Sequence, residues 1–269
     1  MRCMNGLVHL SDLHLGASKA QERAARAMVE VLAQQPSLHV AVTGDLTDRG
    51  RAAEFALFRE VFAPLARSGR LTVIPGNHDR MGDDIASLLS RGRRVWTRSV
   101  PGLYLVCVDS TAAHNRVRWQ SHGEICCRVL EEVDSALDRA PSGARVAVLM
   151  HHHPIPLPEE TVAERFAKAV GWPYTHELHL GQRLLERCLG RADLVLHGHR
   201  HLPRHFSARA VNGRPLEVLN AGSSTELRAW RVVPLEAPTD VRWERLPAGA
   251  VHPALSLPPA PLNLQPAFA

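Results

Sequence analysis

Short apolar runs recur along this chain, and most of them stop abruptly at a glycine or a polar residue. Runs of four to eight residues bounded by turn signals are typical of buried strands, and unbroken ones are typical of parallel strands covered on both faces. Up to residue 196 these runs predict strands at residues 7–10, 40–43, 71–74, 103–108, 146–150 and 194–196.

Helical patterns separate these runs. Residues 18–34 place Ala24, Met28 and Leu32 at helical spacing among Glu and Arg residues, and Pro36 follows them. We therefore expect an amphipathic helix that ends before this proline. Further helices are expected at residues 52–65, 123–139 and 182–189. This alternation of strands and helices favours a layered α/β fold with parallel strands.

The pattern changes in the last third of the chain. Residues 154–181 are interrupted by four prolines, and we interpret them as a lid or specificity loop. Short strand-type runs follow at residues 206–211, 216–219, 227–233 and 241–246, which suits a second sheet packed on the first. We expect one domain over residues 1–246 and an extended or disordered Pro/Ala-rich tail over residues 247–269.

Composition is that of an ordinary soluble globular protein, with 45% hydrophobic and 22% charged residues in 269. The formal net charge is +5, which favours mild attraction to anionic substrates, but no basic patch indicates nucleic-acid binding.

The five cysteines lack a CxxC metal spacing, and we interpret them as reduced thiols. No apolar run approaches the length of a membrane span, and no secretory signal is expected before the first strand. We expect a cytoplasmic protein.

Metal-binding side chains follow five of the predicted strands. They are Asp12, His14, Asp45, Asn77, His78, Asp79, His151, His152, His153, His199 and His201. In open α/β sheets ligands collect at the carboxyl edge of the strands, so one shared site is expected. The mixture of oxygen and imidazole ligands suits divalent Mn, Fe, Zn or Co, and it exceeds what one ion needs. Two ions about 3.5–4 Å apart would share a carboxylate and acidify a bridging water, giving a hydroxide that attacks phosphorus.

The same blocks resemble the five signature blocks of the calcineurin-like metallophosphoesterases, in order. They are Asp12-Leu-His14, Gly44-Asp45-Leu-Thr-Asp48, Gly76-Asn77-His78-Asp79, His152-His153-Pro154 and Gly198-His199-Arg-His201. Asn220-Ala-Gly-Ser223 resembles the strand that usually follows. The resemblance implies a four-layer α/β/β/α sandwich of two mixed sheets with a binuclear metal centre.

Roles for individual residues also follow from the resemblance. It implies that Asp12, His14 and His201 hold the first ion, that Asn77, His152 and His199 hold the second, and that Asp45 bridges them. His78 would face the phosphate with Asp79 as its partner, and Asn77 is a candidate substrate contact. Arg49 and Arg80 are further candidates because they adjoin the ligand blocks, and the alternative is that they are solvated loop arginines.

The sequence does not decide which histidine of His151-His-His153 is the metal ligand. The family spacing of ligand, any residue and proline selects His152. Alternation along the strand would place His151 and His153 on the opposite face.

The residues of these blocks are most similar to those of bacterial phosphodiesterases of the cyclic-nucleotide type. This resemblance implies hydrolysis of small diesters by a metal-bridging hydroxide. Three alternatives share the fold. A DNA nuclease usually carries a longer capping region and works with an ATPase partner. A lipid-precursor pyrophosphatase would be favoured by an apolar lid around residues 155–170. A non-catalytic scaffold typically loses ligands, whereas here the set is complete. Edge strands of the second sheet could allow a homo-oligomer.

Overall fold

Two mixed β-sheets form the centre of the fold in the computed structural model, which describes residues 4–156, 178–247 and 262–263. Most of the predicted lid and of the predicted tail lies outside these residues. The first sheet has the order β11-β10-β1-β2-β3 and the second β12-β8-β9-β7-β6-β5-β4. Strands β1, β2 and β3 are mutually parallel, as are β5, β6, β7 and β9. Strand β4 runs antiparallel to β5, β8 runs antiparallel to β9 but parallel to β12, and β10 runs antiparallel to both β1 and β11.

The first sheet consists of β1 (Gly6–Leu10), β2 (Leu38–Thr43), β3 (Leu71–Ile74), β10 (Ala229–Pro234) and β11 (Arg242–Arg245). The second consists of β4 (Val95–Val100), β5 (Leu103–Val108), β6 (Arg145–Leu149), β7 (Leu194–His197), β8 (Arg204–Arg209), β9 (Pro215–Asn220) and β12 (Leu262–Asn263). The helices are α1 (Lys19–Ala33), α2 (Ala52–Val61), α3 (Ala63–Arg67), α4 (Ile85–Ser90), α5 (Cys127–Asp138), α7 (Gly181–Cys188), α8 (Ser224–Leu227) and the 3₁₀ turns η1 (His78–Arg80) and η2 (Ala113–Arg116).

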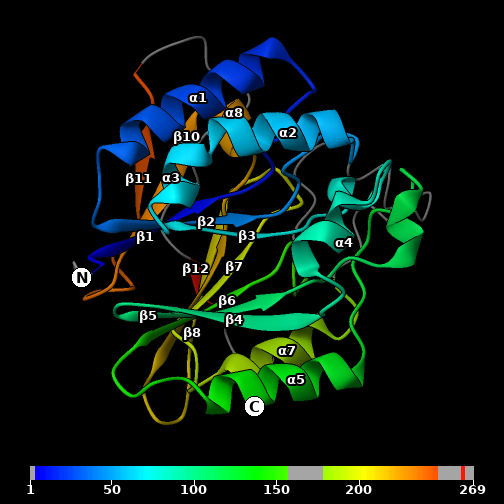
Figure 1. The fold of residues 1–269 in the computed structure, drawn as a ribbon. Coiled ribbons are helices and arrows are strands. Elements are labelled where there is room, and N and C mark those ends of the chain that lie inside the picture. The colour runs from blue at the N-terminus through cyan, green and yellow to red at the C-terminus, as the bar shows by residue number, and fades with distance from the viewer. Residues whose placement is uncertain (1–3, 157–177, 248–261, 264–269) are drawn as a thin grey trace.

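Three apolar layers hold these elements together. Helices α1, α2 and α3 cover the outer face of the first sheet, and α5 and α7 cover the outer face of the second (Figure 1). Alternate residues of a strand face opposite sides of its sheet. In β2, Val40 and Val42 therefore pack against the helices, while Ala41 faces the other sheet. The result is the four-layer α/β/β/α sandwich that the family resemblance implied. The late strands do not form a sheet of their own, as the sequence had suggested: β8 and β9 extend the sheet of β5, β6 and β7, while β10 and β11 extend the sheet of β1, β2 and β3.

Local sequence explains most boundaries. Ser18 caps α1 by accepting a hydrogen bond from the Gln21 N–H, and the apolar stripe of this helix is buried. The predicted helix over residues 52–65 is two helices, because the chain leaves helical geometry at Phe62 and Pro64 starts the second one. The predicted strand over 227–233 begins at Ala229, since residues 224–227 form α8.

The half-exposed edge strand β4 and the short helix α4 were not predicted, and neither were the 3₁₀ turns η1 and η2 or the two-residue strand β12. Among the described residues, no helix combines the length and the hydropathy that crossing a bilayer requires.

Candidate metal centre

The candidate ligands lie on loops at the carboxyl ends of strands from both sheets. Asp12 and His14 follow β1, Asp45 follows β2 and Asn77 follows β3, while histidines from the loops after β6 and β7 approach from the second sheet. Backbone hydrogen bonds join these loops. The Asp12 N–H donates to the Gly44 carbonyl and the Gly198 N–H donates to the His151 carbonyl. Contacts between the sheets bring the loops to one shared edge, because the His199 N–H donates to Asp12 Oδ1 (3.1 Å) and His151 Nδ1 lies 2.7 Å from the Thr43 carbonyl oxygen.

Left-handed backbone conformations concentrate in these loops. Nine non-glycine residues in the described part of the chain have a positive φ, and five of them are candidate ligands: Asp12 (51°), His14 (44°), Asp45 (49°), His199 (74°) and His201 (52°). This region is unfavourable for residues with a Cβ, and such strain collects at functional sites. The fold thus holds these side chains in orientations that an unstrained loop would not adopt.

Two glycines give the ligands room. A Cβ on Gly76 would overlap the carboxylate of Asp45, and a Cβ on Gly198 would overlap Ser11 Oγ and the Asp12 carboxylate. The glycine that precedes each of these ligand loops is therefore required by close packing around the carboxylates.

One group of ligand atoms comes from Asp12, His14 and His201. The Nε2 atoms of His14 and His201 lie 3.0 Å apart, and His201 Nε2 lies 3.5 Å from Asp12 Oδ1. Asp12 is fully buried and His14 nearly so. These three side chains come together as the sequence predicted for the first ion.

A second group surrounds Asn77. Its Oδ1 lies 3.0 Å from His151 Nε2 and 3.0 Å from His199 Nδ1. The Nδ1 of His151 lies 2.7 Å from the Thr43 carbonyl oxygen, which can only accept, so Nδ1 carries a proton. Nε2 is the ring nitrogen that faces Asn77, and it would bind an ion once its own proton is displaced. A second hydrogen bond of this kind fixes the orientation of many metal-binding imidazoles.

Asp45 lies between the two groups. Its Oδ2 is 3.4 Å from His151 Nε2 and 3.7 Å from His14 Nε2, while Oδ1 accepts a hydrogen bond of 2.8 Å from the His78 N–H. Burial opposes ionisation, but the imidazoles of His151, His78 and His14 outweigh it and hold the pKa of Asp45 well below its ordinary value. One ionised carboxylate thus contacts both groups.

The donor set fits divalent transition metals. Four groups each have ligand atoms within 4.8 Å of one another: Asp12/His14/His201, Asp12/Asp45/His151, His14/Asp45/His78 and His151/His152/His199. They combine imidazole nitrogens with carboxylate oxygens, as Mn, Fe, Zn and Co prefer. Two of the groups share Asp45, and they join the other two through Asp12, His14 and His151, so the set is suited to a pair of ions rather than to separate sites.

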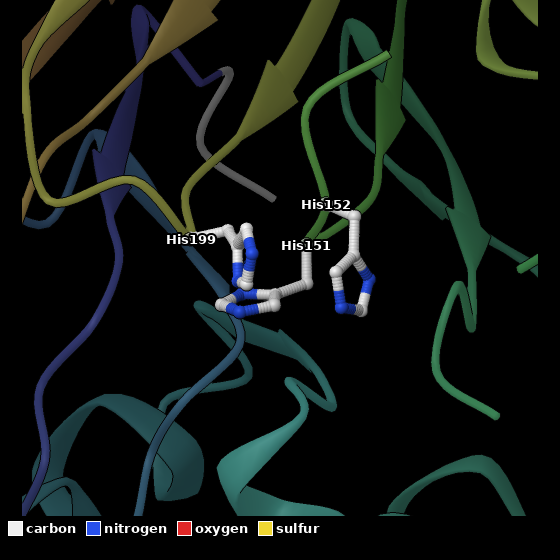
Figure 2. A group of neighbouring side chains, drawn as sticks. All are labelled: His151, His152 and His199. Atoms are coloured by element: carbon white, nitrogen blue, oxygen red, sulfur yellow. The ribbon is translucent and has the colours of Figure 1, made fainter. Parts of the chain in front are cut away.

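His152, the predicted ligand, has other contacts. Its Nδ1 lies 2.8 Å from Ser110 Oγ and its Nε2 2.9 Å from the Ser121 carbonyl oxygen. The rings of His151 and His152 leave the same loop in different directions (Figure 2). Strand β6 ends at Leu149, so strand alternation does not govern residues 151–153. The structure brings His151, not His152, into hydrogen-bond distance of Asn77.

His78 faces this centre from the loop after β3. Its ring is half-buried, with its centroid 4.6 Å from that of His14, and its Nδ1 lies 2.6 Å from the Asp48 carbonyl oxygen. This carbonyl takes the orienting position that the sequence analysis assigned to Asp79.

Asp79 instead joins two loops. Its carboxylate accepts hydrogen bonds from the N–H groups of Gly76 (2.9 Å), Leu46 (3.2 Å) and Thr47 (3.0 Å) and from Thr47 Oγ1 (2.7 Å). Burial, with a contribution from Asp45, raises the pKa of Asp79 to about 6. Its contacts bind the loop of Asp45 to the loop of Asn77.

The two candidate substrate arginines differ. Arg49 is exposed, with Nε 3.3 Å from Asp48 Oδ2. The Arg80 guanidinium is mostly buried and forms ion pairs with Asp109 (2.9 Å) and Asp84 (3.2 Å). Arg80 therefore links the loop after β5 to the start of α4. Its N–H groups are occupied by these partners and not by the candidate phosphate site.

Sequence reasoning missed the groups that orient the ligands. The Thr43 carbonyl, the Ser110 hydroxyl and the Asn220 amide contact ligand loops, yet none lies in a metal-binding pattern. Of these three groups, only Asn220 could have been singled out from the sequence, because it directly follows a predicted strand.

Comparison with known proteins agrees with this geometry. The model of the calcineurin-like phosphoesterase family matches residues 7–203. A cAMP/cGMP dual specificity phosphodiesterase of Mycobacterium tuberculosis is 28% identical over 243 residues, which cover 82% of this chain and 68% of that protein. A probable cyclic nucleotide phosphodiesterase of Rhodococcus erythropolis is 30% identical over 165 residues, covering 56% of this chain and 52% of that protein.

The crystal structure of a dimetal phosphatase from Danio rerio shares the fold. It superimposes with a TM-score of 0.61 over 87% of this chain and 93% of that chain, at 12% sequence identity. At this identity the likeness concerns the fold alone.

Proposed function

Because the chain belongs to the calcineurin-like phosphoesterase family, we propose that it hydrolyses phosphodiester bonds with two divalent transition-metal ions. The observation that carries this proposal is the position of Asp45 Oδ2, within 3.7 Å of His14 Nε2 on one side and 3.4 Å of His151 Nε2 on the other. A carboxylate shared in this way is what a pair of ions requires. When bound, such ions polarise the phosphoryl group and lower the pKa of water at the site.

The proposed ligands follow the two groups of side chains. Asp12, His14 and His201 would hold the first ion, and Asp45 would be shared. For the second ion we assign Asn77 and His199 together with His151, whose Nε2 is directed at Asn77 Oδ1. The original prediction of His152 stays a prediction, and a paired substitution separates the two.

His78 would act on the substrate. Since the Asp48 carbonyl can only accept, Nδ1 of His78 carries a proton and Nε2 is the nitrogen left for substrate. In its protonated form this imidazole would neutralise charge on the phosphoryl group or donate a proton to the leaving oxygen. Asp79 would contribute by holding the loops of Asp45 and Asn77 at a fixed separation.

Small diesters such as cyclic nucleotides are the proposed substrates, since both curated relatives are described as cyclic nucleotide phosphodiesterases. The chain spans about two-thirds of the first relative and about half of the second, so the substrate is carried over as a proposal. Manganese, iron, zinc or cobalt would serve as the ions.

Activity assays test the proposal. Wild-type protein loaded with Mn²⁺ should hydrolyse a chromogenic phosphodiester, and Asp45→Ala and Asn77→Ala should abolish hydrolysis. Asp138→Ala, on the exposed face of α5, is the matched control and should retain activity. A panel of cyclic nucleotides, glycerophosphodiesters, nucleoside diphosphate lipids and phosphomonoesters then ranks the substrates. Much faster cleavage of monoesters than of diesters would contradict the proposed preference.

A further inference from the structure

Asn220, the last residue of β9, lies behind the metal-binding loop that follows β7. The two strands are parallel neighbours, and Asn220 is in register with His197, directly before Gly198-His199-Arg-His201. Asn220 is completely buried. A buried amide must have its donor and acceptor satisfied, so its contacts show what it holds.

Both ends of the Asn220 amide bind backbone. Nδ2 donates to the Gly198 carbonyl oxygen at 2.9 Å, and Oδ1 accepts from the Gly222 N–H at 2.7 Å. A carbonyl can only accept and an N–H can only donate, so the amide fits in one orientation. Asn220 therefore ties the loop of His199 and His201 to its own turn.

The Gly198 peptide contacts both groups of candidate ligands. Its N–H donates to the His151 carbonyl oxygen at 3.0 Å, and its Cα packs against Ser11 and Asp12 without room for a Cβ. The next residue, His199, donates its N–H to both carboxylate oxygens of Asp12 at 3.1 Å. A shift of the Gly198 carbonyl would consequently move ligands of both proposed ions.

The first sheet anchors Asn220 from the other side. Arg231 of β10 donates from Nε to the Asn220 carbonyl oxygen at 3.1 Å and from Nη2 to the Arg204 carbonyl oxygen at 2.7 Å. Its guanidinium is buried, with its carbon 4.4 Å from the centre of the Trp243 ring. Burying a cation is costly unless its partners are well placed, and here two carbonyl oxygens and the Trp243 ring fill that role. The turn after Asn220 adds a further link, because Ser223 Oγ donates to the Asp12 carbonyl oxygen at 2.8 Å.

We propose that Asn220 is a positioning residue of the metal centre, whose amide fixes the Gly198 carbonyl and thereby the loop that presents His199 and His201. The inference rests on the proposed function, because it concerns the same pair of ions. Residues that orient the ligands of a metal typically change its affinity about 10–100-fold when they are replaced.

The test measures Mn²⁺ binding to the metal-free full chain by isothermal titration calorimetry. Asn220→Asp keeps the shape and the acceptor but replaces the donor with an oxygen that faces the Gly198 carbonyl. Asn220→Ala removes both bonds. The matched control is Tyr104→Phe in β5 of the same sheet, which loses a buried donor to the Ala136 carbonyl (3.0 Å) remote from the ligand loops.

We expect both Asn220 variants to bind Mn²⁺ about 10–100-fold more weakly than wild type, and Tyr104→Phe to bind it as wild type does despite a lower Tm. Circular dichroism verifies that each variant is folded. If Asn220→Ala does not fold, the Mn²⁺ affinity of Asn220→Asp alone tests the inference. Unchanged Mn²⁺ affinity in a folded Asn220→Asp variant overturns the inference alone. Wild-type protein that binds no Mn²⁺ contradicts the proposed function and overturns the inference with it.

Discussion

The Nε2 atoms of His14 and His201 lie 3.0 Å apart, although 187 residues separate them in the sequence. Both residues adopt left-handed backbone conformations, so the fold directs the two imidazoles at one point. Two lone pairs that converge in this way need a proton or a cation between them. Asp12 Oδ1, 3.5 Å from His201 Nε2, supplies negative charge at the same point.

We expect these two histidines to act as a unit. His14→Ala and His201→Ala should each lower kcat/KM at least about 100-fold, which is roughly 2.7 kcal/mol of transition-state stabilisation. Because the same ion is lost in each case, the double variant should be no worse than the poorer single variant. Steady-state kinetics on a chromogenic diester measures this. Fully additive losses would show that the two side chains serve separate purposes.

Substitution of His151 and of His152 should have different consequences. His151→Ala should leave about one ion bound per chain instead of two, because it removes the Nε2 that faces Asn77 and Asp45. His152→Ala should keep both ions but lose about 1–3 kcal/mol of stability, since it leaves Ser110 and Ser121 without their partner. Metal analysis and urea unfolding give the two readouts. The opposite pattern would support His152, the ligand predicted from the spacing to proline.

Asp79 should prove to be a positioning residue. Asp79→Asn places an NH₂ group among three backbone N–H donors. We therefore expect the free energy of unfolding to fall by about 1–3 kcal/mol, with no change in its dependence on urea concentration. The pH–rate profile should keep its shape while kcat falls. A displaced limb of that profile would instead indicate that Asp79 acts on the ionisation of His78.

Remote from the metal centre, His39 should make the free energy of unfolding depend on pH. It is buried between β2 and β3 with Nε2 2.8 Å from Thr72 Oγ1, and burial, with Arg98 and Arg70, lowers its pKa to about 3. Between about pH 3 and 6.5 the unfolded chain binds this proton and the folded chain does not, so stability falls as the pH falls. His39 should therefore lower the free energy of unfolding by about 2 kcal/mol at pH 5 relative to neutral pH.

His39→Gln, which cannot take up this proton, provides the comparison. Its free energy of unfolding should fall by about 2 kcal/mol less between pH 7 and pH 5 than that of the wild type. Parallel pH profiles for the two proteins would mean that His39 takes up its proton in the folded state at the same pH as in the unfolded chain.

The sequence was most informative where chemistry follows a strand directly. Asp12, Asp45 and Asn77 each stand one to three residues beyond a buried strand, and neighbouring parallel strands carry them to one edge. The layered α/β fold and the convergence of these ligands could therefore be predicted from the strand pattern, whereas the four-layer arrangement was predicted from the family resemblance.

Orientation within a loop could not be predicted in this way. The direction of the His151 ring is set by the Thr43 carbonyl, 108 residues away, and that of His152 by Ser110 and Ser121. Such partners have no local pattern in the sequence. Arg80 shows the same limit, since its ion pairs with Asp84 and Asp109 exist only after α4 and β5 are in place. Edge strand β4 escaped prediction because its polar, half-exposed residues do not form an apolar run.

The central claim is a pair of ions that share Asp45. The most direct measurement is anomalous diffraction from a crystal of the full chain grown with Mn²⁺. We predict two anomalous peaks about 3.5–4 Å apart, both within bonding distance of the Asp45 carboxylate, one beside His14 and the other beside His151. A single peak, or peaks that do not contact Asp45, would contradict the account.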